Sequence, residues 1–208
     1  MAVCSYCIAL MPLLGQACRY CAYPLPDTSH LVCGNCIKKR PYFDCTMIHY
    51  PFEEPLRSLL HQFKYHHGLY LGSFLSHLIL QSLQNHTNMP QCLIPVPMHP
   101  KRIKLRGFNQ AVILTRWLAK KLQLPYDITS CKKIINTEPQ ATLNGEQRQR
   151  SLRHAFKTQK LPYKHVAIID DLLTTGSTAN ELAFTLKKSG VAQVDVWCCA
   201  RTIPKTHS

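Results

Sequence analysis

Acidic side chains are scarce in this 208-residue sequence, where 11 Asp and Glu stand against 25 Lys and Arg and the formal net charge is +14. Such an excess favours partners that carry phosphate, namely nucleotides, nucleic acid or anionic lipid.

Long hydrophobic runs are missing too. The best candidate, 69–83, is interrupted by glycine, serine, histidine and glutamine, whereas a membrane-spanning helix needs about 20 apolar residues. We therefore expect no membrane insertion.

The N-terminus lacks the features of a secretion signal. No Lys or Arg precedes Arg19. Ile8–Leu14 is apolar, but Cys4 and Cys7 before it do not fit the pattern of a signal sequence. We therefore expect a protein of the reducing cytoplasm. A hydrophobic content of 46% and a charged content of 17% are typical of a folded chain. The length predicts one main domain with a small appendage.

Cysteines mark that appendage. Six of the 11 cysteines form three C-x-x-C pairs within the first 36 residues: Cys4 with Cys7, Cys18 with Cys21, and Cys33 with Cys36. Two such pairs supply four thiolates for one tetrahedral zinc ion. We predict a zinc ribbon over residues 1–45, with Cys18, Cys21, Cys33 and Cys36 as ligands, because Cys4 and Cys7 lie where chain ends fray. The set Cys4, Cys7, Cys18 and Cys21 has almost the same spacing and stays open.

Disulfides and a redox-active pair are the alternatives for these cysteines. Disulfides are rare in reducing compartments, and a thioredoxin-like pair needs a strand-to-helix setting that this loop-rich segment lacks. No H-x-E precedes a C-x-x-C pair, which excludes the zinc-deaminase arrangement and makes the expected zinc structural. The other cysteines are predicted to be small buried hydrophobes: Cys45, Cys92, Cys131, Cys198 and Cys199.

Residues 46–208 alternate between helical and strand patterns. We predict two helices within 55–84, separated near 66–68, a strand over 92–97, a helix over 108–122, a strand over 166–169, a helix over 178–188 and a strand over 194–200. Phe108 and Trp117 are interpreted as core residues of the third helix. Pro41–Tyr50 is interpreted as a linker and Asn136–Arg150 as a long mobile loop. Continuous apolar strands alternating with amphipathic helices indicate a parallel α/β sheet flanked by helices.

One segment combines two acids with a hydroxyl-rich turn. The strand ending at Ile169 runs into Asp170 and Asp171, and Thr174-Thr175-Gly176-Ser177-Thr178 then leads into a helix. Hydroxyls and backbone N–H groups at a helix start favour phosphate binding. Carboxylates suit sugar hydroxyls or Mg²⁺. A Walker B strand is excluded because no G-x-x-x-x-G-K-[ST] is present, and an ordinary N-capped turn needs no paired acids. The pattern predicts a phosphosugar site.

The segment 166–178 resembles the 5-phosphoribosyl-1-pyrophosphate (PRPP) signature of type I phosphoribosyltransferases. Other features are similar to the ComF family of competence proteins and its GntX-like relatives: Phe63-Lys64-Tyr65, Pro95-Val96-Pro97, Arg106-Gly107-Phe108-Asn109-Gln110, the 140–156 stretch and the N-terminal cysteine pairs. Many relatives have four cysteine pairs where this chain has three. Many also have Asn where Ser151 stands, so Ser151 is given no role.

The resemblance implies a bacterial cytoplasmic protein with a zinc ribbon ahead of a phosphoribosyltransferase-like domain at 46–208, associated with uptake of single-stranded DNA in natural transformation. It implies that Asp170 and Asp171 hold the ribose hydroxyls, directly or through Mg²⁺, and that the loop binds the 5-phosphate through Thr174, Thr175, Gly176, Ser177 and Thr178. Enzymatic transfer of phosphoribosyl groups, and a non-catalytic PRPP sensor or DNA-binding adaptor, remain two hypotheses. A helicase of the uptake apparatus is a candidate protein partner.

The basic run at Lys101, Arg102, Lys104 and Arg106 has three interpretations. It follows a predicted strand, so it can bind the pyrophosphate of PRPP at the sheet edge. Its charge density also suits the phosphates of single-stranded DNA, with Phe108, Tyr126 or Tyr163 available to stack bases. The third interpretation is a solvated basic face.

Overall fold

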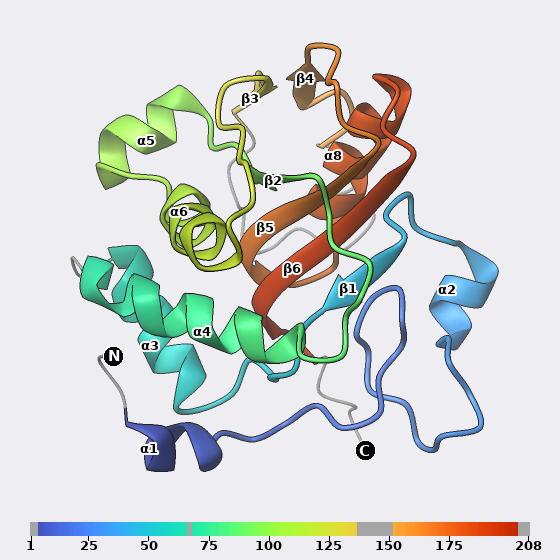
Figure 1. The fold of residues 1–208 in the computed structure, drawn as a ribbon, viewed down its shortest axis with the longest axis vertical. Coiled ribbons are helices and arrows are strands. Elements are labelled where there is room, and N and C mark those ends of the chain that lie inside the picture. The colour runs from blue at the N-terminus through green and yellow to red at the C-terminus, as the bar shows by residue number, and fades with distance from the viewer. Residues whose placement is uncertain (1–3, 66–67, 137–151, 204–208) are drawn as a thin grey trace.

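The centre of the fold is a parallel four-stranded sheet (Figure 1). A computed structural model describes residues 4–65, 68–136 and 152–203. The strand order is β1-β6-β5-β2. The bounds are Cys45–Met47 for β1, Cys92–Pro95 for β2, His165–Leu173 for β5 and Gln193–Arg201 for β6. The predicted α/β class, with a parallel sheet between helices, is confirmed.

Helices cover both faces of this sheet. On one side lie α3 (Leu56–Tyr65), α4 (Gly72–Ser82) and α6 (Gln110–Leu122), and on the other lies α8 (Ser177–Lys188) (Figure 1). Strand β5 divides its side chains between two hydrophobic clusters: Val166 and Ile168 pack with α8, whereas Ala167 and Ile169 pack with the other three helices. Because both faces are buried, the strand is apolar without alternation.

Short elements complete the described chain. Helix α1 (Ser5–Ala9) packs Ile8 into the α3 and α4 side of the core, and α2 (Gly34–Lys38) ends the cysteine-rich segment. A 3₁₀ helix at Gly68–Leu71 separates α3 from α4, and α5 spans Pro100–Arg106. Strands β3 (Cys131–Lys133) and β4 (Phe156–Thr158) form a separate antiparallel pair. No helix in the described ranges has the length and apolarity to span a bilayer.

The helices predicted within 55–84, over 108–122 and over 178–188 are present, as are the three strands, with boundary shifts of a few residues. The predicted strand end at Ile169 is wrong, because β5 keeps pairing with β6 as far as Leu173 and Arg201. Pro41–Tyr50 is more than a linker, since its residues 45–47 form β1 and pair with β6. Helix α5 and the β3–β4 pair were not predicted. The expected loop over 136–150 falls, except for Asn136, outside the described residues.

Trp117 corrects the predicted core. Its side chain is 40% exposed, whereas Leu114, one helical turn earlier, is fully buried. The apolar face of α6 is thus rotated toward Leu114 and Leu118, and Trp117 lies at its border. Phe108 is half-buried, with its ring centroid 6.3 Å from that of Phe63. The cysteines outside the pairs are buried as predicted, except for half-buried Cys45.

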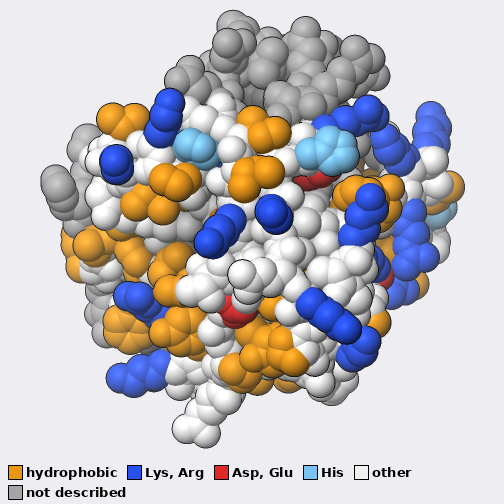
Figure 2. All heavy atoms as spheres, turned by 90° about the horizontal axis from the view of Figure 1, so that it is seen from above, with side chains coloured by type: hydrophobic (Ala, Val, Ile, Leu, Met, Phe, Trp, Pro, Cys, Tyr) orange, Lys and Arg blue, Asp and Glu red, His pale blue; other side chains and the backbone are white. Residues whose placement is uncertain are grey.

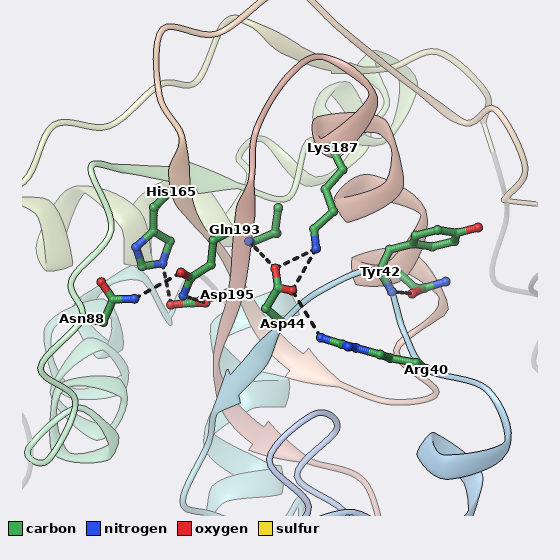
Figure 3. Close-up of polar contacts among 10 residues, drawn as sticks. Arg40, Tyr42, Asp44, Asn88, His165, Lys187, Gln193 and Asp195 are labelled. Carbon is green, nitrogen blue, oxygen red and sulfur yellow. Dashed lines mark hydrogen bonds and ion pairs between the residues drawn. The ribbon is translucent and has the colours of Figure 1, made fainter.

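Polar contacts fix the linker to the amino-terminal half of β6 (Figure 3). Asp44 Oδ2 accepts a hydrogen bond from the Val194 backbone N–H at 2.8 Å, and Lys187 Nζ donates to Asp44 Oδ1 at 2.9 Å. Beside them, the fully buried Asp195 lies 2.8 Å from His165 Nε2. These contacts hold the segment that joins the cysteine-rich region to the sheet.

Candidate functional site

Strand β5 delivers two carboxylates to one edge of the sheet. Asp170 and Asp171 lie in its last part, where parallel strands of α/β proteins present ligand-binding residues. Asp171 is only 3% exposed and Asp170 is half-buried. The backbone N–H of Asp171 donates to Asp170 Oδ1 at 2.9 Å. The two side chains are therefore adjacent but unequal in their surroundings.

Lys64 neutralises the deeper carboxylate. Its Nζ lies 2.6 Å from Asp171 Oδ2. Burial is the largest influence on the pKa of Lys64 and lowers it. The charge and hydrogen bond of Asp171, together with the charge of Asp170, outweigh burial, so the net shift is upward. Asp170 forms no ion pair with any residue in the described part of the chain. Burial, and then repulsion from Asp171, raise the pKa of Asp170 well above its usual value. A cation or a hydroxyl-bearing ligand beside Asp170 therefore relieves an unfavourable charge.

The hydroxyl-rich turn lies directly beyond these acids. Thr174 and Thr175 are exposed, and Gly176 has a φ of +76°, which favours glycine and lets the chain reverse into α8. Thr175 Oγ1 lies 2.9 Å from Ser177 Oγ and accepts a long 3.3 Å hydrogen bond from the Ser177 N–H. The turn borders a 630 Å³ cavity through Thr175, Gly176 and Ser177. The turn thus borders open space at the positive end of a 12-residue helix, although the Ser177 N–H already has a long bond to Thr175.

Arg201 supports this turn from behind, and sequence analysis missed it. Its Nη1 donates to the backbone carbonyls of Leu173 and Thr174, and its Nε donates to the Cys21 carbonyl at 2.8 Å. The side chain is 7% exposed. One guanidinium therefore fixes the turn to the cysteine-rich segment. The sequence signal would have been an arginine that directly follows the apolar run of a predicted strand.

The basic run divides into two faces of α5. Arg102 and Arg106, four residues apart, line a 370 Å³ cavity together with Lys64, Tyr65 and Phe108. Lys101 and Lys104 are exposed and do not line it. The Arg106 guanidinium lies over the Tyr65 ring at 5.0 Å and donates to Gln110 Oε1 at 2.8 Å. Because Lys64 contacts Asp171, this cationic cavity adjoins the carboxylates.

Lys133 is a further cation of the site that the sequence did not indicate. It extends from β3, and burial lowers its pKa, with the charge of Arg102 adding to the effect and that of Asp170 opposing it. Lys133 is therefore near both groups. Figure 2 shows the molecule from above, where basic side chains are spread over the surface and acidic ones are few. Lys64 and Lys133 thus place positive charge beside Asp171 and Asp170.

Four cysteines converge in the N-terminal segment. The sulfur atoms of Cys18, Cys21, Cys33 and Cys36 all lie within 4.8 Å of one another, and Cys21 Sγ is 3.6 Å from Cys33 Sγ. Tetrahedral zinc with Zn–S bonds of about 2.3 Å places sulfurs at such separations. The donor set fits a structural zinc ion. Cys4 adjoins α1, is exposed and is not part of this cluster. The four cysteines that the sequence analysis favoured as ligands are therefore the four that lie together.

The environment of the thiols agrees with metal ligation. Burial raises the pKa of Cys21 to about 11, and neighbouring cysteine charges contribute. Burial also acts to raise the pKa of Cys18, but backbone hydrogen bonds from Cys33, Cys21 and Tyr20 outweigh it and lower the pKa. Four thiols this close repel one another once ionised, and a divalent cation removes that repulsion.

Comparison with known proteins gives a consistent family. The chain is 34% identical over 178 residues to competence protein F of Haemophilus influenzae, covering 81% of this chain and 78% of that protein. It is 33% identical over 208 residues to the DNA utilization protein YhgH of Escherichia coli K12, covering 97% and 91%. It is 24% identical over 201 residues to competence protein ComFC of Bacillus subtilis, covering 91% and 80%.

No family model matches the chain. Among solved structures, the glutamine PRPP amidotransferase of B. subtilis aligns with a TM-score of 0.44 and 12% identity, over 66% of this chain and 30% of that one. Identity of about one third across nearly the whole length decides the matter: the chain belongs to the ComF family, that of competence protein F.

Proposed function

We propose that this protein binds PRPP, or a closely related phosphosugar, and acts in the handling of imported single-stranded DNA during natural transformation. The observation that carries the ligand is the strand-to-helix turn on which Asp170, Asp171 and the Thr174–Thr178 loop occur together, with cationic cavities at both ends. The DNA role is supported by relatives named for competence and DNA utilization. A cytoplasmic location follows from this role.

Each part of the proposed site has a chemical role. Asp170 and Asp171 accept hydrogen bonds from the ribose hydroxyls, directly or through Mg²⁺. Thr174 to Thr178 bind the 5-phosphate with hydroxyl and backbone donors. Lys64, Arg102 and Arg106 bind the pyrophosphate. Bound Mg²⁺ would neutralise phosphate charge, and carboxylate oxygens are its usual protein ligands. The excess positive charge around Asp170 suits a ligand that carries several negative charges.

The zinc ion has a structural role in this proposal. Residues 1–45 form the zinc ribbon and residues 46–208 form the phosphoribosyltransferase-like domain. Cys18, Cys21, Cys33 and Cys36 hold the ion, which closes a segment that contains few apolar contacts of its own. Such a ribbon, exposed beside the sheet, is also a surface on which a helicase of the uptake apparatus can dock.

Transfer of the phosphoribosyl group would follow from charge. Departure of pyrophosphate leaves positive charge on the anomeric carbon and negative charge on the leaving group. Lys64, Arg102, Arg106 and Lys133 are placed to stabilise the leaving group. In this proposal Asp170, which is not ion-paired with Lys64, balances the developing charge on the sugar. The reaction class would be glycosyl transfer from PRPP to a nucleophile.

A non-catalytic PRPP sensor or DNA-binding adaptor is the second candidate, and one contact favours it. The ion pair between Lys64 and Asp171 uses one of the two carboxylates already, at 2.6 Å. A site that keeps this pair holds its ligand with Asp170 alone, and such a site can bind the sugar without assisting departure of pyrophosphate.

Ligand binding is tested by thermal unfolding. PRPP with Mg²⁺ should raise the melting temperature, because a ligand that binds only the folded state stabilises it. The combined variant Asp170→Asn and Asp171→Asn should lose this rise, whereas Lys120→Gln on the exposed part of α6 should keep it. Absence of a rise in the parent protein would remove PRPP as the ligand.

Catalysis is tested separately. The parent protein is incubated with PRPP, Mg²⁺ and a panel of nucleobases and single-stranded DNA, and release of pyrophosphate is measured. Release that depends on one acceptor and disappears in Arg102→Gln supports the transferase. A clear thermal rise without release from any acceptor supports the sensor or adaptor.

A further inference from the structure

A second cavity shares the hydroxyl-rich turn with the proposed phosphosugar site. Its volume is 630 Å³, within the range of about 300 to 1,000 Å³ common for ligand pockets. Thr175, Gly176 and Ser177 form one wall. Cys21, Cys33 and Cys36 of the cysteine cluster and the segment 38–43 complete its lining. The cavity therefore begins where a 5-phosphate would bind and extends away toward the ribbon.

The lining of this cavity is cationic and aromatic. Lys38, Lys39, Arg40 and Arg201 contribute positive charge, and no Asp or Glu is among the described lining residues. Tyr42 adds a ring that is 49% exposed. Arg201 already bonds the turn and Arg40 lies 3.9 Å from Asp44 Oδ1. PRPP ends at its 5-phosphate monoester, so it would leave Lys38, Lys39 and Tyr42 without a ligand contact. A ligand that continues beyond the 5-phosphate would use them.

The wall formed by 38–43 is held in place before any ligand arrives. The backbone N–H of Tyr42 donates to Asn180 Oδ1 of α8 at 2.7 Å (Figure 3). The Tyr42 ring centroid lies 4.7 Å from that of Phe184. Phe43 is 2% exposed and lies beside Gly176. A cavity between fixed walls binds at a lower entropic cost than a flexible surface.

The order of groups along this path implies a polarity. In the proposed function the sugar hydroxyls bind at Asp170 and Asp171 and the 5-phosphate binds at the turn, and the cations of the cavity lie beyond it. In a nucleic acid strand only the 3′-terminal nucleotide has a free 3′-hydroxyl together with a 5′-phosphate that continues into a chain. Cations along a groove with an aromatic ring for base stacking are the usual elements of single-strand binding.

We propose that this cavity binds the 3′ end of single-stranded DNA, with the terminal sugar at Asp170 and Asp171, its 5′-phosphodiester at Thr174–Thr178, and the preceding nucleotides along Lys38, Lys39 and Tyr42. The inference rests on the proposed function for the position of the sugar. It goes further by giving the site a polymeric ligand with one defined end. PRPP and the strand then compete for the same turn.

The test measures binding of a dye-labelled 12-nucleotide strand by fluorescence anisotropy. A strand with a free 3′-hydroxyl should bind at least about tenfold more tightly than the same strand with a 3′-phosphate. The phosphate removes the hydroxyl that donates to Asp170 and adds bulk where the terminal sugar fits. Circular single-stranded DNA should bind as weakly as the blocked strand, and PRPP should displace the free strand. An RNA strand of the same sequence that binds more tightly still supports the proposal, since it offers a second hydroxyl.

Matched variants separate this cavity from the rest of the basic surface. Lys38→Gln with Lys39→Gln should weaken the free strand and reduce the dependence of log K on log salt by about 1.4, at about 0.7 per phosphate contact in single strands. Metal content and the PRPP-induced thermal rise should not change. Lys120→Gln with Lys121→Gln removes the same charge from the exposed end of α6 and should leave strand binding unchanged.

Equal affinity for free, blocked and circular strands would overturn the inference. So would an unchanged strand affinity in the Lys38 and Lys39 variant. If PRPP stabilises the protein while strand ends are not distinguished, only the inference fails. If neither PRPP nor phosphate stabilises it, the proposed function fails, and end-selective strand binding that persists would then place the terminal sugar elsewhere.

Discussion

Lys64 and Asp171 form a 2.6 Å ion pair that joins the end of α3 to the end of β5. The aspartate is 4% exposed and the lysine 21% exposed in their side chains. Its neighbour Asp170 has a raised pKa, caused by burial and by repulsion from Asp171. The ionised side chain of Asp171 therefore stabilises the folded protein, whereas that of Asp170 destabilises it.

Replacing these acids one at a time should therefore change stability in opposite directions. Asp171→Asn leaves Lys64 largely buried without its partner and should cost about 2 to 3 kcal/mol, less than a fully buried pair because the lysine is partly solvated. Asp170→Asn removes an unfavourable charge and should raise the free energy of unfolding by about 0.5 to 2 kcal/mol, the usual range for a stabilising substitution. Urea unfolding at neutral pH measures both. The same sign for the two variants would contradict this account.

The pH dependence follows from Asp170. Its pKa is raised in the folded protein, so the folded state holds that proton more tightly and loses stability as pH rises from the ordinary aspartate range through the raised value. Asp170→Asn lacks this loss. The difference in melting temperature between variant and parent should therefore grow from about pH 4 toward neutral pH and then level off. A constant difference would mean that ionisation of Asp170 carries no cost.

The cysteine cluster should contain one zinc ion per chain. Cys18→Ser should remove it and destabilise the protein by about 3 kcal/mol or more, because the metal supplies the folding energy of such ribbons. Cys4→Ser should retain the ion, since Cys4 is outside the four-sulfur group. Elemental analysis with thermal unfolding tests both. Loss of zinc in the Cys4 variant would indicate the alternative ligand set.

Arg201 should link the ribbon to the phosphate-binding turn. Arg201→Met leaves the carbonyls of Cys21 and Thr174 without their guanidinium donor, while the Leu173 carbonyl keeps its bond from the Thr202 N–H. This loss should cost about 2 to 4 kcal/mol. Beyond this loss, the rise in melting temperature caused by inorganic phosphate or PRPP should shrink, because the turn is no longer fixed. Arg201→Lys keeps the charge with fewer donors, so its stability and its ligand-induced rise should lie between those of the parent and Arg201→Met. An undiminished rise in both variants would make Arg201 structural only.

The two faces of α5 should separate two activities. Arg102→Gln should weaken PRPP binding by about tenfold, the usual effect of about 1.4 kcal/mol for a charged hydrogen bond, since Arg102 lines the cavity beside Lys64. Lys101→Gln with Lys104→Gln should leave PRPP binding intact and reduce the salt dependence of DNA binding. Calorimetry with PRPP and anisotropy with DNA provide the comparison. Equal effects of both variants on PRPP would refute the division.

The sequence by itself determined the local features of this protein. Uninterrupted apolar runs such as 166–169 predicted buried parallel strands. The C-x-x-C pairs predicted a four-thiol cluster but left two ligand sets open. The acids followed by a hydroxyl-rich turn gave the candidate site, which stays a prediction. All of these depend on residues close together in the chain, where periodicity and spacing leave few structural alternatives.

Only the tertiary structure decided the relationships between distant segments. It joined Lys64 to Asp171 across 107 positions of sequence, placed Arg201 against Cys21, and turned Arg102 and Arg106 but not Lys101 and Lys104 toward a cavity. It also recruited 45–47 as an edge strand and left Trp117 at the surface. Such pairings depend on how helices rotate and strands extend once both faces of the sheet are packed, and local sequence does not encode that packing.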